Sequence, residues 1–159
     1  MPTFPLEHNR SSEEAHPRKN QQYRAKEQLE LVHTDIAGPF NPKSVDKKGY
    51  QYNHVMIDDF SRKSWCIPLK KKSDTKVAIK EWVAMAENQT GKNLKKLRSD
   101  NGGEFIDRSL EAWLKEKGIL HRTIPARSPQ SNRVAERMNR TLQDRARSML
   151  VGAGLGGGF

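Results

Sequence analysis

Three acidic residues at separate positions are the part of this chain best suited to chemistry. Asp35 comes at the end of an apolar run over residues 29–36, Asp100 follows a second run over 94–99, and Glu136 lies near the start of a long amphipathic stretch. Thirty-five residues lie between Asp100 and Glu136. Carboxylates from three separate elements can hold two divalent metals against a phosphodiester, which is the chemistry of cutting and joining nucleic acid.

Each of these acids also has a structural interpretation. Asp35 could simply end a strand, Asp100 could begin a turn, and Glu136 could pair with Arg140 one helical turn away. Taken alone, each structural interpretation is favoured, because acidic residues are mostly solvated surface groups. The three together favour a site of oxygen ligands for Mg²⁺ or Mn²⁺, in which Asp35 bridges two ions while Asp100 and Glu136 hold one each.

The elements that must position these acids follow from hydrophobic spacing. The spacing predicts strands over residues 29–36, 50–57, 64–69, 94–99 and 119–124, and helices over about 74–90, 109–117 and 131–150. This order predicts an α/β fold with one mixed five-stranded sheet flanked by helices. If the strands before Asp35 and Asp100 are neighbours, both carboxylates project from the same edge of the sheet. We expect Val134, Met138, Leu142 and Met149 to form the buried face of the last helix, which leaves Glu136 outside the core.

Composition limits the kind of protein and its partners. The formal charge of +10 favours a polyanionic partner through phosphate contacts. A single cysteine excludes an internal disulfide and fits an intracellular location, and the chain has no apolar run of the ~18 residues that a membrane span needs. We expect a flexible leader over 1–26, a catalytic core over 27–151 and a glycine-rich tail over 152–159.

Basic residues gather over 62–80, over 92–98 and along the last helix. A lysine run is usually a solvated loop, but arginines that share a helix face with Glu136 are better suited to bidentate phosphate contact. Arg133, Arg137 and Arg147 are such candidates, and they would position a duplex without reading its bases. His33, two residues before Asp35, is interpreted as a packing histidine in preference to a metal ligand.

Four strings extend the pattern beyond the acids: LELVHTDIAGP at 29–39, IDDFSRK at 57–63, RSDNGGEF at 98–105 and VAERMNRTL at 134–142. In this order they resemble the catalytic core of copia-type retrotransposon integrases, part of a retrovirus-related Pol polyprotein. The resemblance implies a ribonuclease H-like fold and a catalytic, metal-binding triad of Asp35, Asp100 and Glu136. It also implies that Asn139 and Arg140 touch the DNA end of the element.

The activity that the resemblance implies is metal-dependent 3′-end processing of element DNA and strand transfer into target DNA. Two Mg²⁺ or Mn²⁺ ions, element ends and a target duplex would be its cofactors and partners, with a homo-oligomer acting in the nucleus. Two alternatives remain open. One is a retrotransposon remnant that binds nucleic acid without turnover, and the other is a ribonuclease H-like nuclease acting on an RNA–DNA hybrid.

The chain departs from the family pattern in three places. His8 and His16 have no accompanying cysteines, so no zinc is expected in this chain, and the proline- and tryptophan-bearing segment expected after residue 155 is replaced by glycines. Arg133 stands where the family usually has glycine. If residue 133 requires a positive φ, arginine strains the start of the catalytic helix. If φ is negative, arginine fits and adds a phosphate contact.

Overall fold

The computed structural model describes residues 24–40, 49–124 and 133–154 of the 159. The described part contains five strands, three α-helices and one short 3₁₀ helix. In chain order these are β1 (Val32–Ala37), β2 (Tyr52–Asp58), β3 (Ser64–Leu69), η1 (Lys72–Asp74), α1 (Thr75–Thr90), β4 (Lys96–Asp100), α2 (Arg108–Glu116), β5 (Leu120–Ile124) and α3 (Arg133–Gly152).

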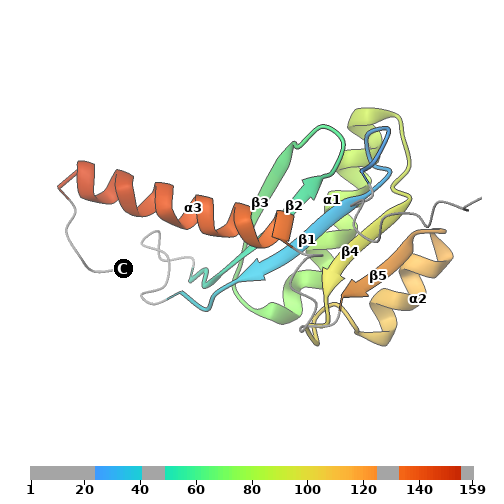
Figure 1. Ribbon diagram of the computed structural model, residues 1–159. Coiled ribbons are helices and arrows are strands. Elements are labelled where there is room, and N and C mark those ends of the chain that lie inside the picture. Colours follow the sequence, from blue (N-terminus) through green and yellow to red (C-terminus); the bar gives the residue numbers. More distant parts are fainter. Residues whose placement is uncertain (1–23, 41–48, 125–132, 155–159) are drawn as a thin grey trace, which may run out of the picture.

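The strands form one mixed sheet in the order β3-β2-β1-β4-β5. β1, β2 and β3 pair antiparallel, whereas β4 and β5 run parallel to β1. α1 and α2 cover one face of this sheet, and α3 crosses the other face over β1 and β2 (Figure 1). The predicted mixed five-stranded sheet with flanking helices is confirmed.

Alternation along the strands supplies two apolar faces of unequal size. The larger core lies between the sheet and the first two helices, and its largest members include Met56, Leu97, Trp82, Phe105 and Leu110. The smaller core lies under α3, where Val55 and Ile57 of β2 pack against Ala135. α3 is therefore attached by few apolar side chains, all of them in its first half.

The predicted start of the first strand is wrong. Leu29 has a φ of 61°, in the left-handed region, and β1 begins only at Val32. The Leu29 N–H donates to Asp58 Oδ1 at 2.9 Å, and its side chain is buried in the larger core. This tertiary contact overrides the strand preference of the apolar run.

The predicted buried face of the last helix is right only in its first half. Val134, Met138 and Leu142 pack against the smaller core, but Met149 is 70% exposed. α3 runs past the edge of the sheet, so its second half has no described element to pack on (Figure 1). No helix in the described ranges is both long enough and apolar enough to span a membrane.

Candidate functional site: an acidic cluster between β1, β4 and α3

Two of the predicted acids lie on adjacent parallel strands. β1 and β4 pair with His33 opposite Arg98, so Asp35 and Asp100 stand two residues further along on the same face. Leu97 and Ser99, which alternate with Asp100, point to the other side and are fully buried. The predicted placement of both acids at one edge of the sheet follows from this register.

Glu136 comes to the same face from α3. It lies in the first turn of the helix and is exposed, whereas Ala135 beside it is fully buried against β2. Burial raises the pKa of Asp35, and the negative charges of Asp100 and Glu136 raise it further. The structure therefore brings the three carboxylates within electrostatic reach of one another.

The carboxylates are not gathered around a common point. Across residues 24–40, 49–124 and 133–154, no three His, Cys, Asp or Glu side chains are arranged to hold a metal ion. The arrangement is a region of concentrated negative charge with an exposed glutamate on its helix side.

Asn139 is closer to the acids than its predicted role implies. The residue is 5% exposed, and its Nδ2 donates to Asp35 Oδ2 at 2.6 Å. This bond lowers the pKa of Asp35, against the larger effect of burial. Asn139 Oδ1 is also buried and has no hydrogen-bond partner among the described residues. The amide nitrogen of Asn139 thus holds one oxygen of Asp35, while its own amide oxygen, Oδ1, lies at the site without a hydrogen bond from the described residues.

The segment after β4 fixes Asp100 through its own backbone. The Gly102 N–H donates to Asp100 Oδ1 at 3.0 Å. A side chain at Gly102 would displace the end of the Glu104 side chain, because its Cβ would lie 2.8 Å from the Glu104 carboxyl carbon. Glu104 in turn forms an ion pair with Lys72 at 3.2 Å. Buried Phe105 anchors this loop, so Gly102, Glu104 and Phe105 of the string DNGGEF each have a local structural role.

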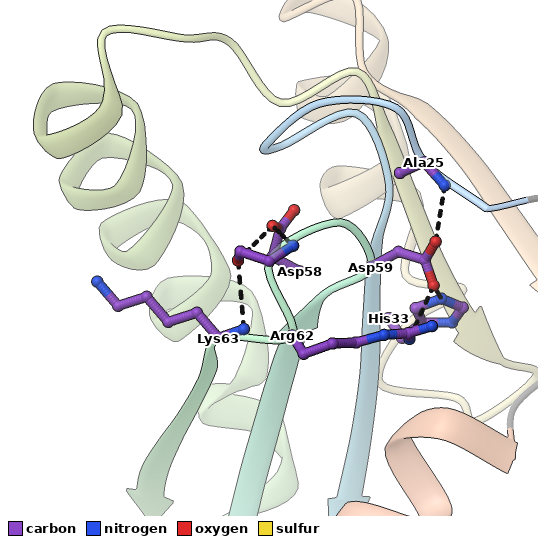
Figure 2. Close-up of polar contacts among 7 residues, drawn as sticks. Ala25, His33, Asp58, Asp59, Arg62 and Lys63 are labelled. Carbon is purple, nitrogen blue, oxygen red and sulfur yellow. Dashed lines mark hydrogen bonds and ion pairs between the residues drawn. The ribbon is translucent and has the colours of Figure 1, made fainter.

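A second acidic cluster, formed by Asp58 and Asp59, lies at the other end of β1 (Figure 2). Asp58 and Asp59 are 1% and 4% exposed. Asp58 accepts from the Leu29 and Ser61 N–H groups and from the Ser61 hydroxyl. Asp59 accepts from the Ala25 N–H at 2.7 Å and from Arg62 Nη1 at 3.0 Å, and it lies 3.1 Å from His33 Nε2.

His33 is a packing histidine, as expected. It is 1% exposed, and burial lowers its pKa, so the ring is neutral near pH 7 and Nε2 donates to Asp59. Two adjacent aspartates directly after an apolar strand, followed by an arginine three residues later, were the sequence signal for this buried network.

The predicted DNA contacts on α3, apart from Asn139, are all exposed: Arg133, Arg137, Arg140 and Arg147. Among the described residues, positive φ angles at non-glycine positions occur only at Leu29 and Arg62. Arg133 is the first residue of α3 and is not strained. Of the two interpretations of this departure from the family pattern, the unstrained one is correct.

Comparison with known proteins agrees with this geometry. The family model "integrase core domain" matches residues 25–129. The chain belongs to the integrase core domain family. It is 45% identical over 123 residues to a retrovirus-related Pol polyprotein from transposon TNT 1-94 of Nicotiana tabacum, covering 77% of this chain. It is 32% identical over 135 residues to the Pol polyprotein of transposon RE2 of Arabidopsis thaliana, covering 84%. The chain spans 9% of the length of each of these polyproteins.

Solved structures show the same fold. A chain of the simian T-cell lymphotropic virus intasome, in complex with PP2A regulatory subunit B56 gamma, matches with a TM-score of 0.66 and 19% identity over 82% of this chain and 44% of that one. The HTLV-2 integrase catalytic core domain in complex with magnesium, in its trimeric form, matches with a TM-score of 0.58 and 21% identity. This match covers 81% of this chain and 76% of that one. The ribonuclease H-like fold and the copia-type integrase assignment are both confirmed.

Proposed function

We propose that this integrase core carries out metal-dependent 3′-end processing and strand transfer of retrotransposon DNA, with Asp35, Asp100 and Glu136 as its catalytic and metal-binding residues. The observation that carries the proposal is that carboxylates from β1, β4 and α3 lie on one side of the sheet, near enough for Asp100 and Glu136 to raise the pKa of Asp35. Carboxylates that repel one another in this way gain stability from a bound cation.

The residues fit a hard divalent cation in their chemistry. All three acids offer oxygen, which Mg²⁺ and Mn²⁺ prefer, and the buried Asn139 Oδ1 without a partner is a further oxygen at the same place. When bound, two such ions supply Lewis acidity to the attacking and the leaving oxygen of an in-line displacement at phosphorus. The magnesium complex of the similar HTLV-2 catalytic core supports the choice of ion.

The other residues of the site orient the acids and the substrate. Asn139 holds Asp35 through its amide, and the Gly102 N–H holds Asp100. Arg133, Arg137, Arg140 and Arg147 extend along the exposed side of α3, where guanidinium groups can bind the phosphates of the element end and the target duplex. A DNA substrate with two ends to join also favours a homo-oligomer, acting in the nucleus.

The test is joining activity on a pre-branched DNA substrate with Mg²⁺ or Mn²⁺. This substrate suits a chain limited to the core, since it arrives already joined. We expect wild type to be active and Glu136→Gln to have no detectable activity, whereas Glu116→Gln on the exposed side of α2 is unchanged. Arg133→Gly should not raise the activity above wild type, because Arg133 begins α3 without strain and its substitution removes a phosphate contact. Activity that survives Glu136→Gln would refute the assignment.

A second function has one observation in its favour. Because the described carboxylates are not arranged around a common ion, a core that binds nucleic acid without turnover is the alternative. In that case wild type and Glu136→Gln would be equally inactive on the branched substrate, while both bind duplex DNA.

A further inference from the structure

The face of the sheet that carries Asp35 and Asp100 has a second row of charged residues, one alternation earlier along the strands. His33 of β1 is opposite Arg98 of β4, and Arg98 is opposite Arg122 of β5. Residues opposite one another on parallel strands share a face, and neighbouring strands are about 4.8 Å apart. These three residues therefore form a straight row across the sheet, about 7 Å from the row of Asp35 and Asp100.

Arg62 extends this row at its β1 end. Its Nη1 lies 3.0 Å from Asp59 Oδ1, the same oxygen that accepts from His33. Figure 2 shows Asp59 between Ala25 on one side and His33 with Arg62 on the other. Asp59 thus fixes both Arg62 and His33. We call Arg62, Arg98 and Arg122 the arginine row.

The arginine row has more positive than negative charge. The carboxylate bonded to the row is Asp59, which forms its ion pair with Arg62. Within the described ranges, neither Arg98 nor Arg122 forms an ion pair with an acidic side chain. Arg98 and Arg122 stand opposite one another on the neighbouring strands β4 and β5. Two arginines that repel one another on a partly buried surface are stabilised by an anion from outside.

No element in the described part of the chain covers the arginine row. α3 packs on β1 and β2 and runs away from β4 and β5 (Figure 1). The side chain of Arg62 is 47% exposed, Arg122 is exposed and Arg98 is partly so. Leu97, which alternates with Arg98, is fully buried in the core on the opposite face, so the strand cannot turn Arg98 inward.

We propose that the arginine row binds the phosphate backbone of duplex DNA and leads the duplex toward the acidic cluster on the same face of the sheet. A DNA strand presents one phosphate per ~3.4 Å of helix axis, so a row that spans three strands faces several phosphates at once. Backbone contacts of this kind position a duplex without reading its sequence. The proposal rests on the proposed function for its choice of DNA, but the contact itself requires no catalysis.

The experiment measures binding without metal, so that it does not depend on turnover. The full chain in EDTA is titrated against a fluorescein-labelled blunt duplex of about 20 base pairs of arbitrary sequence, and anisotropy is followed at several NaCl concentrations. The variants are Arg98→Gln, Arg122→Gln and their combination. The matched control is Lys115→Gln with Lys117→Gln, which removes two positive charges from exposed positions on and just after α2.

We expect each arginine variant to bind about 3- to 10-fold more weakly, and the slope of log affinity against log salt to fall by about one per arginine. The lysine pair should keep the wild-type slope. If Arg98→Gln lowers the melting temperature, Arg122→Gln still decides the result, because Arg122 is exposed. Equal losses in the Arg122 and lysine variants would overturn the proposal. The same titration is repeated with an RNA hairpin. If Arg122→Gln weakens binding to the hairpin but leaves duplex binding unchanged, the proposal is overturned and the arginine row is assigned to RNA.

These outcomes are separable from those of the catalytic proposal. A chain without joining activity that still loses duplex binding in Arg122→Gln supports the arginine row alone. Normal joining activity with unchanged duplex binding in the arginine variants contradicts the row and leaves the carboxylate assignment in place.

Discussion

The two ends of β1 carry two acidic clusters that differ in how their oxygens are used. At the start of the strand, the chain itself satisfies Asp58 and Asp59: backbone N–H groups, a hydroxyl, a histidine and an arginine all donate to them. At its end, Asp35 accepts from Asn139 and Asp100 from Gly102, while Glu136 is exposed. The first cluster is complete without a ligand, whereas the second has concentrated negative charge and an unused amide oxygen.

This difference separates a structural role from a binding role. Buried carboxylates with all oxygens bonded stabilise the fold, and removing one leaves several donors unsatisfied. Clustered carboxylates with few donors are destabilising until a cation or a substrate arrives. Removing charge should therefore have opposite effects on stability at the two ends of one strand.

The largest expected effect on stability is at the cluster of Asp58 and Asp59. Asp59→Ala leaves the Ala25 N–H, His33 and Arg62 without their acceptor, and should lower the free energy of unfolding by about 3–5 kcal/mol. Urea unfolding followed by circular dichroism measures this. Asp144→Ala, at an exposed position of α3, is the control and should change it little. A loss below about 1 kcal/mol at Asp59 would contradict a structural role for this cluster.

A smaller effect concerns His54, a buried histidine of β2 that stands opposite Ile36 of β1. Burial lowers its pKa to about 4, so the unfolded chain binds the proton between pH 6.5 and 4 and the folded chain does not. The free energy of unfolding should fall by about 3 kcal/mol as pH drops through this window. His54→Gln, whose amide can still bond to Thr34 Oγ1, should have a shallower pH dependence. Parallel curves for the two proteins would show that His54 is already protonated or solvated in the folded state.

At the cluster of Asp35, Asp100 and Glu136, removing a charge should stabilise the fold. Burial and two neighbouring acids raise the pKa of the Asp35 carboxyl group, so its negative charge is unfavourable. Asp35→Asn removes this charge and should increase the free energy of unfolding by ~0.5–1 kcal/mol in metal-free buffer. Thermal unfolding in EDTA measures the change. A destabilisation as large as that of Asp59→Ala would show that the two clusters do not differ in kind.

The smallest effect tests the loop behind Asp100. Gly102→Ala places a Cβ 2.8 Å from the Glu104 carboxyl carbon, which must move away from Lys72. Because the obstructing atoms are the end of a flexible side chain, the cost should be below about 1 kcal/mol. Gly103→Ala is the matched control, since nothing lies within 4 Å of its Cβ. The two melting temperatures give the difference, and identical values would mean that Glu104 is not held against the loop.

Much of this comparison could be predicted from the sequence, but not all. The strands and helices follow from local periodicity, and the placement of Asp35 and Asp100 follows from the strands that precede them. The left-handed Leu29 could not be predicted, because its cause is a hydrogen bond to Asp58, twenty-nine residues away. Met149 was placed in the core because helical spacing does not reveal where the sheet ends.

The sequence also did not show which side chains would contact one another. Asn139 was matched to a DNA contact, yet its side chain is buried against Asp35, a pairing that depends on how α3 crosses β1. The arginine row was visible only as separate basic clusters. Its alignment depends on the parallel register of β1, β4 and β5, which composition and spacing do not specify.

The most direct test of the difference between the two clusters is the binding of Mn²⁺ to the full chain, followed by the electron paramagnetic resonance signal of the free ion. We expect wild type to deplete this signal, the double variant Asp35→Asn with Asp100→Asn to leave it unchanged, and Glu111→Gln with Glu116→Gln on α2 to behave as wild type. Equal depletion by wild type and the Asp35/Asp100 variant would contradict the claim that the unsatisfied cluster is the metal site.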